Sequence, residues 1–233
     1  MRIFNTIVLT LILLSFIACS SEEEMEEFNN QDENMEKVIE RIKAYSPTKI
    51  SADVSNLTSN QKKVIDLLVK AGKVSDEIFW IQNTPDAVSI RDSLRNSNSK
   101  SAKVYLDYVN INYGPYDEIY GSERFVGDGP SIRPDGGNFY PVEMTKNDFE
   151  NYIVENPDVK EEFTSQYTII RKDETGLTAI PYHEAYAEKV EKLAKLLEKA
   201  AEYADNPSLK NYLILRAKAV RSDEYYESDM AWM

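Results

Sequence analysis

Apolar residues recur at the spacing of an α-helix along most of this chain. Val38, Ile39 and Ile42 share one face of a helix predicted over 35–45. The longest pattern of this kind covers about 181–203, where leucines and alanines recur at intervals of three and four residues. A chain with this periodicity buries one stripe of each helix, so we expect a mostly helical fold.

Capping residues and prolines predict where the other elements begin. Further helices are expected to start near residues 57, 84, 102, 145 and 206, and a last helical turn near 223. Gly72 is expected to interrupt the helix that starts at 57. Tyr167–Arg171 and Leu177–Ile180 flank a short polar turn and predict a β-hairpin. The expected fold class is therefore α+β, mostly helical with a small β-hairpin.

The stretch 112–141 differs from the rest because it holds most of the eight glycines together with several prolines and aromatic residues. Its composition predicts an irregular but ordered segment. Long aromatic loops of this kind often line binding surfaces in compact proteins.

The first residues have the layout of a secretory signal, with a basic start, an apolar middle and a small residue before the cut. The apolar run over 7–17 is too short to cross a bilayer, which takes roughly 20 apolar residues. The ending Phe16-Ile17-Ala18-Cys19-Ser20 resembles the lipobox of bacterial lipoproteins. We therefore expect residues 1–18 to be an export signal and Cys19 to be the lipid-bearing residue of the mature protein.

Cys19 is the single cysteine, so an intramolecular disulfide is excluded. Several acyl chains on one residue hold a domain on a membrane, because each buried methylene contributes about 0.8 kcal/mol. The polar, acidic stretch 19–34 predicts a flexible tether. The expected location is a lipid anchor in the outer membrane, with the protein in the periplasm or on the cell surface.

Charge excludes one class of partner. The chain has 27 Lys and Arg against 40 Asp and Glu, a net charge of −13. So acidic a protein repels phosphate backbones, and nucleic acid is not an expected partner.

No complete active site is evident from the residues themselves. His183 is the only histidine, and Ala187 and Glu188 stand where a zinc helix would need a second one. A serine triad would have to use the same histidine, and no serine lies in a Gly-x-Ser-x-Gly turn. We interpret His183 as an exposed or capping residue.

Six strings, taken in order, resemble the dipeptidyl-peptidase III family of zinc metallopeptidases, in the bacterial branch close to the Nudix-fused plant members. They are Glu77-Ile78-Phe79-Trp80-Ile81-Gln82, Ile111-Asn112-Tyr113-Gly114-Pro115-Tyr116-Asp117, Asn138-Phe139-Tyr140-Pro141, Met144-Thr145-Lys146 with Phe149-Glu150, Ile180-Pro181-Tyr182 with Ala185-Tyr186, and Asp223 to Trp232.

The resemblance implies the N-terminal part of a two-lobed fold around a wide cleft. In that family the zinc ligands lie in a His-Glu-x-x-x-(x)-His helix and a later glutamate, C-terminal to the region matched. This sequence lacks the motif. Zinc is therefore expected for the complete family member and no cofactor for this chain. Residues 35–233 are expected to be a truncated, non-catalytic N-terminal portion, since the chain stops within the apolar turn 230–233.

Within this resemblance, the loop 112–141 is expected to help build the cleft for a peptide substrate. The candidate cleft-lining residues are Asn112, Tyr113, Tyr116, Asp117, Phe139 and Tyr140. Two hypotheses remain at this point. The chain is either the first part of a membrane-anchored zinc peptidase, inactive without the missing C-terminal part, or a self-contained lipoprotein that binds a peptide or partner without catalysis.

Overall fold

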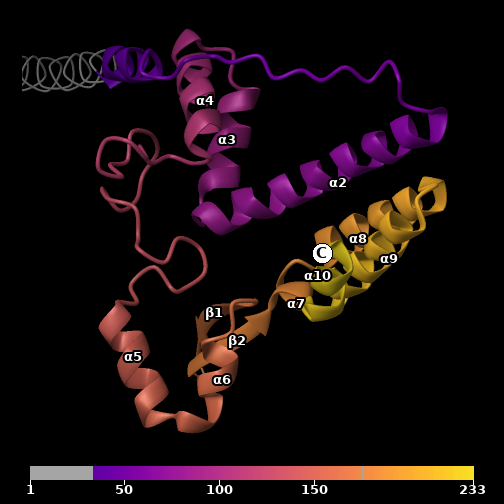
Figure 1. Ribbon diagram of the computed structural model, residues 1–233. Helices are drawn as coiled ribbons and strands as arrows, with labels where there is room; N and C mark the ends of the chain where they lie inside the picture. Colours follow the sequence, from indigo (N-terminus) through magenta and orange to yellow (C-terminus); the bar gives the residue numbers. More distant parts are fainter. Residues whose placement is uncertain (1–33, 175) are drawn as a thin grey trace, which may run out of the picture.

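The computed structural model describes residues 34–174 and 176–233 (Figure 1). The predicted signal, Cys19 and all but the last residue of the predicted tether lie outside these residues. Asn34 is already helical, in a segment that covers 34–42. None of the helices described is long and apolar enough to cross a membrane.

The described chain is mostly helical with one two-stranded antiparallel sheet, which confirms the α+β expectation. After the helical segment 34–42, the elements follow in this order: α2 (Ser59–Asn83), α3 (Ala87–Asn96), α4 (Lys100–Asn112), α5 (Lys146–Glu155), a 3₁₀ turn (Pro157–Val159), α6 (Lys160–Phe163), β1 (Thr168–Asp173), β2 (Gly176–Pro181), α7 (Tyr182–Ala185), α8 (Ala187–Tyr203), α9 (Pro207–Ser222) and α10 (Tyr226–Trp232).

Helix α2 connects two parts of the molecule. Helix α8 packs along one stretch of it, with α9 against α8, while α3 packs near its C-terminal end, with α4 against α3 (Figure 1). Helix α2 begins at a capping box in which Thr58 accepts from the backbone N–H of Gln61. The predicted interruption at Gly72 is wrong. One glycine costs a helix only about 1 kcal/mol, and the burial of Ala71 and Val74 on either side outweighs that cost.

The main core lies between α2, α8 and α9, where Leu67, Ala194, Leu197 and Leu213 are buried. The predicted continuous helix over about 181–203 is wrong at two residues, because Pro181 still belongs to β2 and Tyr186 interrupts the helix. Tyr186 leaves helical geometry, with φ −121° and ψ 27°, and separates α7 from α8. Its ring is buried in this core, so a change of chain direction there is stabilised by packing.

Two smaller cores complete the described chain. One holds Val38, Trp80 and Tyr108 between the first helical segment, the end of α2, and α4. The other joins the hairpin to α5 and α6 around Ile170, which is opposite Ala179 in the register of β1 and β2. The predicted hairpin is thus confirmed. Ile169, next to Ile170 on the opposite face of β1, is buried in the main core.

Candidate functional site

The segment between α4 and α5 is irregular, as its composition predicts, and it runs past the end of α2 to the hairpin (Figure 1). Within the described chain, its regular pairings are two isolated β-bridges, Tyr116 with Arg124 and Glu123 with Ile132. Its order comes instead from side chains that bind backbone groups at three points.

The first point is a buried carboxylate. Arg41 donates to Asp117 Oδ2 at 2.7 Å, and the Tyr108 hydroxyl donates to the same oxygen at 2.6 Å. Asp117 Oδ1 accepts the backbone N–H groups of Ile119 and Tyr120. Burial, reinforced by the hydrogen bond to Asp117, raises the pKa of the Tyr108 hydroxyl. Asp117 is fully buried and fully paired, so it fixes the start of the loop.

The second point is Arg124, whose side chain is almost buried. Its guanidinium donates to the Tyr116 hydroxyl at 2.7 Å and to the carbonyl of Pro130 at 3.1 Å. It also pairs with Asp86 at 2.8 Å, at the N-terminus of α3. One side chain therefore ties two distant parts of the loop to a helix.

The third point lies where the loop crosses from α2 to β1. Asn138 binds the last turn of α2 through two hydrogen bonds. Its side-chain amide donates to the Ile81 carbonyl at 2.7 Å, and its backbone N–H donates to the Gln82 carbonyl. Arg171 on β1 donates to the Asn138 carbonyl at 2.9 Å. Gly137 adopts φ +52°, and a Cβ there would come within 2.7 Å of the Asn83 carbonyl oxygen. Only glycine fits this crossing.

These contacts locate three of the six candidate cleft-lining residues in the interior. Tyr116 and Asp117 are buried in the loop, and Asn112 is buried where its amide binds the Tyr108 carbonyl and the Glu118 N–H. Their side chains therefore hold the loop rather than line a surface of the described chain. The sequence indicated the segment but carried no signal for the direction of each side chain.

The other three candidates are less enclosed. Tyr113 ends α4 in the left-handed conformation, and its hydroxyl donates to Asp76 on α2. Phe139 packs partly buried against Tyr182. Tyr140 lines a pocket, so it is the candidate that the structure brings to a concave surface.

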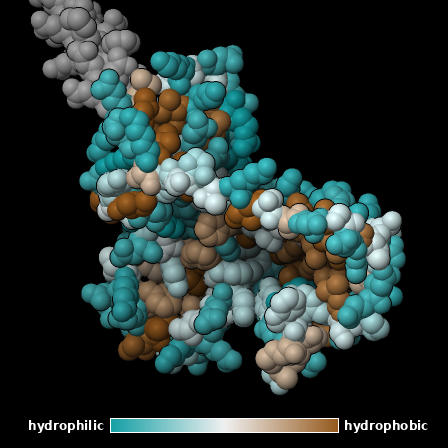
Figure 2. All heavy atoms as spheres, turned by 45° about the horizontal axis from the view of Figure 1, so that its top comes forward, coloured by the Kyte–Doolittle hydropathy of each residue, from teal (hydrophilic) through white to brown (hydrophobic). Residues whose placement is uncertain are grey.

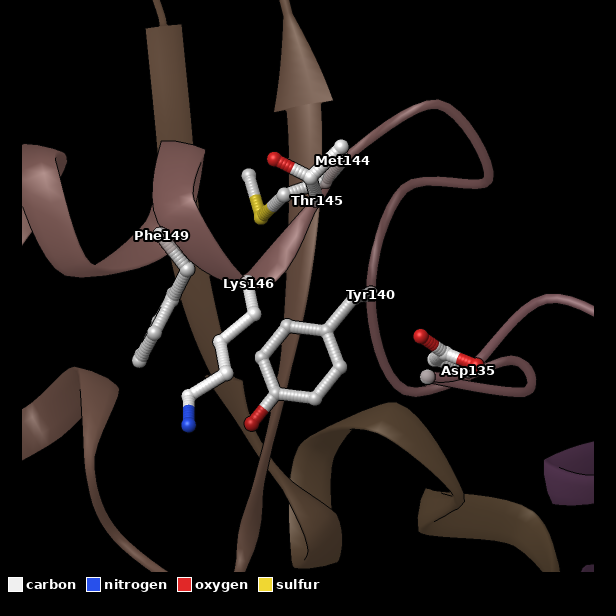
Figure 3. Close-up of a pocket in the computed structure, with 7 residues that line it drawn as sticks. Asp135, Tyr140, Met144, Thr145, Lys146 and Phe149 are labelled. Carbon is white, nitrogen blue, oxygen red and sulfur yellow. The ribbon is translucent and has the colours of Figure 1, made fainter.

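This pocket lies where the loop meets the start of α5 (Figure 3). Its volume is about 210 Å³, and its residues come from the end of the loop and from α5: Asp135, Gly136, Tyr140, Met144, Thr145, Lys146 and Phe149. Sequence reasoning did not single out Asp135 or Gly136. The remaining residues occur in two of the strings that carry the family resemblance, which is the only sequence signal for them.

The single histidine has a structural partner. His183 Nδ1 lies 2.8 Å from Asp223 Oδ2, and the same oxygen accepts the His183 backbone N–H. This contact joins α7 to the left-handed residue that ends α9. Among the described residues, no three histidine, cysteine or acidic side chains come together as metal ligands. A catalytic zinc takes three protein ligands, so the residues around His183 do not fit the zinc that the resemblance implies for the complete protein.

The fold and sequence together resemble part of a dipeptidyl-peptidase III. A solved dipeptidyl-peptidase III from Caldithrix abyssi superposes with a TM-score of 0.77 and is 44% identical, over 81% of this chain and 36% of that chain. A second, from Corallococcus sp. strain EGB, has a TM-score of 0.77 and 28% identity, over 85% of this chain and 36% of that chain.

A curated relative, Nudix hydrolase 3 of Arabidopsis thaliana, is 29% identical over 243 residues, which cover 83% of this chain and 32% of the relative. No family model matches the chain. The chain thus spans about a third of the length of the relatives that it matches. The resemblance to dipeptidyl-peptidase III is confirmed for this region.

Proposed function

We propose that the chain is the non-catalytic first portion of a membrane-anchored, zinc-dependent peptidase of the dipeptidyl-peptidase III type. The observation that carries this proposal is the 44% identity to the Caldithrix abyssi protein across most of the chain, together with the shared fold. A region that covers about a third of such a protein supplies part of its framework.

Two features support the absence of catalysis by this chain alone. The sequence has one histidine and no His-Glu-x-x-x-His string, and that histidine is bound to Asp223. A zinc-activated water needs a metal held by several ligands. In this proposal, those ligands come from the rest of the complete protein.

Zinc analysis and peptidase assays test the proposal. The full chain, purified alone, is expected to hold no stoichiometric zinc and to release no dipeptide from a dipeptidyl-naphthylamide. The complete protein is expected to do both, and a chelator should abolish the release. Dipeptide release by this chain alone would overturn the inactive assignment. A complete protein that binds short peptides but neither zinc nor cleavable substrate would favour a binding lipoprotein instead.

We also propose that Cys19 carries the lipid anchor and that the protein is held at the outer membrane, facing the periplasm or the cell surface. The support is the signal-like start and the lipobox-like Phe16–Ser20 string. Intact-mass spectrometry of the membrane-extracted protein is expected to show Cys19 as the acylated N-terminal residue. A Cys19→Ser variant should lose the acyl mass and leave the membrane fraction. An unmodified, soluble wild-type chain would contradict this proposal.

A further inference from the structure

The pocket in Figure 3 has charges of opposite sign on either side of the Tyr140 ring. The Asp135 carboxylate has no hydrogen bond or ion pair with any other described residue. On the other side, the Lys146 side chain is 84% exposed, and its ammonium lies 3.6 Å from Glu150. An exposed pair at this distance is worth less than about 1 kcal/mol. Both charges are therefore available to a ligand.

Between the charges, the pocket is apolar. Tyr140 and Phe149 meet edge to face with ring centroids 5.3 Å apart, and Met144 completes the lining. The volume of about 210 Å³ exceeds the roughly 150 Å³ of a cavity that takes up benzene. One large apolar side chain fits in that space. Methionine adapts its shape to such groups because its side chain is unbranched and polarisable.

We propose that this pocket binds a short peptide with free ends and a large apolar side chain. The side chain lies between Tyr140, Met144 and Phe149, the ammonium group pairs with Asp135, and the carboxylate pairs with Lys146. A simple anion or cation would satisfy only one of the two charges, whereas a zwitterion satisfies both. The choice of a peptide among zwitterions rests on the proposed function, and the dipeptide is the smallest such peptide.

A methyl NMR titration of the full chain, labelled with [methyl-¹³C]methionine, tests the proposal directly. The Met144 signal is assigned with a Met144→Leu variant. Alanyl-phenylalanine is expected to shift this signal in a saturable manner, because the methyl group lines the pocket. The signals of Met230 and Met233, on and beyond α10, should stay in place.

Blocked peptides and charge variants test each end of the ligand. N-acetylation or C-amidation is expected to weaken binding by roughly three- to tenfold, since each removes one charged contact. The variants Asp135→Asn and Lys146→Gln should weaken binding of the unblocked dipeptide by a similar factor. Matched controls are Asp128→Asn in the same loop and Lys103→Gln on α4, both exposed, which should leave the titration unchanged.

The absence of a saturable Met144 shift up to about 10 mM dipeptide, well above a millimolar Kd, would overturn the proposal. Equal binding by the charge variants would overturn it as well. These outcomes are separable from the function proposed above. If the complete protein releases dipeptides while the pocket binds none, only the pocket assignment fails. If the pocket binds while the complete protein holds no zinc and releases no dipeptide, the peptidase assignment fails.

Discussion

Single side chains, rather than regular hydrogen-bond ladders, hold the loop between α4 and α5. Asp117 and Arg124 bind nearby backbone groups and also pair with charged side chains outside the loop, whereas Asn138 binds the Ile81 carbonyl, 57 residues away. Two of them are charged and nearly enclosed, so the loss of one partner leaves another charge unpaired in a buried place. The stability of the loop conformation therefore depends on the side chains of a few residues.

Replacing Asp117 with alanine is expected to lower the free energy of unfolding by about 3–5 kcal/mol, because Arg41 and the Tyr108 hydroxyl lose their shared acceptor. Tyr108→Phe should cost less, about 1–3 kcal/mol, since it removes one donor and leaves the ion pair intact. Urea denaturation measures both. Asp128→Ala, at an exposed position in the same loop, serves as the control and should stay within about 0.5 kcal/mol of the wild type.

Buried tyrosines predict a loss of stability in alkali. Burial is the main cause that raises the pKa of Tyr182 to about 12, and it also raises the pKa of Tyr108. A tyrosine is neutral when protonated, and an unfolded tyrosine titrates near 10. The unfolded state therefore binds fewer protons above that pH. The contribution of these residues is complete below pH 10 and is lost as the pH rises toward 12.

Thermal melts between pH 8 and 12 check this expectation, with absorbance at 295 nm reporting tyrosinate. Tyr182→Phe should flatten the decline above pH 10, whereas Tyr226→Phe, at a position that is 72% exposed, should not. A melting temperature that stays constant up to pH 12 would contradict the assigned burial.

Helices and strands end where local signals place them, except where packing intervenes. Helices α5 and α9 start near the expected residues 145 and 206. Thr145 forms a capping box with Asp148, and Asn206 caps α9. Gly72 and Tyr186 behave differently from expectation. At both positions the burial of neighbouring apolar groups in the main core decides the backbone conformation.

Gly72 and Gly137 test this distinction between local preference and packing, because a Cβ has free space at the first position and meets backbone at the second. Gly72→Ala should stabilise the protein by about 0.5–1 kcal/mol, because the position is helical and a Cβ would meet nothing within 4 Å. Gly137→Ala should destabilise it by at least about 1–3 kcal/mol, since φ is +52° and the Cβ would meet the Asn83 carbonyl oxygen.

Chemical denaturation of the two variants in parallel provides the measurement. Each serves as the control for the other, because both exchange the same two residue types. Equal effects at the two positions would show that the crossing at Gly137 is not constrained as described.

The face of the molecule seen in Figure 2 is mainly hydrophilic, with several separate apolar patches. One apolar group lies on α9 and α10, where Ile214 is 48%, Met230 50% and Trp232 70% exposed. Large exposed apolar surfaces favour association between molecules. They also agree with the proposal that this chain is one portion of a larger protein.

The full chain is therefore expected to self-associate at micromolar to millimolar concentration. A Met230→Ser, Trp232→Ser double variant should reduce the association measured by sedimentation velocity. Val154→Ser removes a residue on α5 that is 78% exposed and should leave it unchanged. A wild-type chain that is monodisperse and melts cooperatively would count against the proposal that it is a portion of a longer fold.

The sequence by itself determined the elements that depend on neighbouring residues. Helical periodicity, caps and the hairpin turn act over a few positions, so the helices, the hairpin and the irregular segment 112–141 could be predicted. The resemblance to dipeptidyl-peptidase III also followed from short strings and was confirmed by the shared fold.

Only the tertiary structure decided which residues of that segment face inward. The partners of Asp117 and Asn138 lie on helices far away in the sequence, as Arg41 is 76 residues from Asp117. The pocket forms from a loop end and a helix start that meet beside the hairpin. Local patterns carry no record of such distant contacts, because long-range packing sets side-chain direction in an irregular loop.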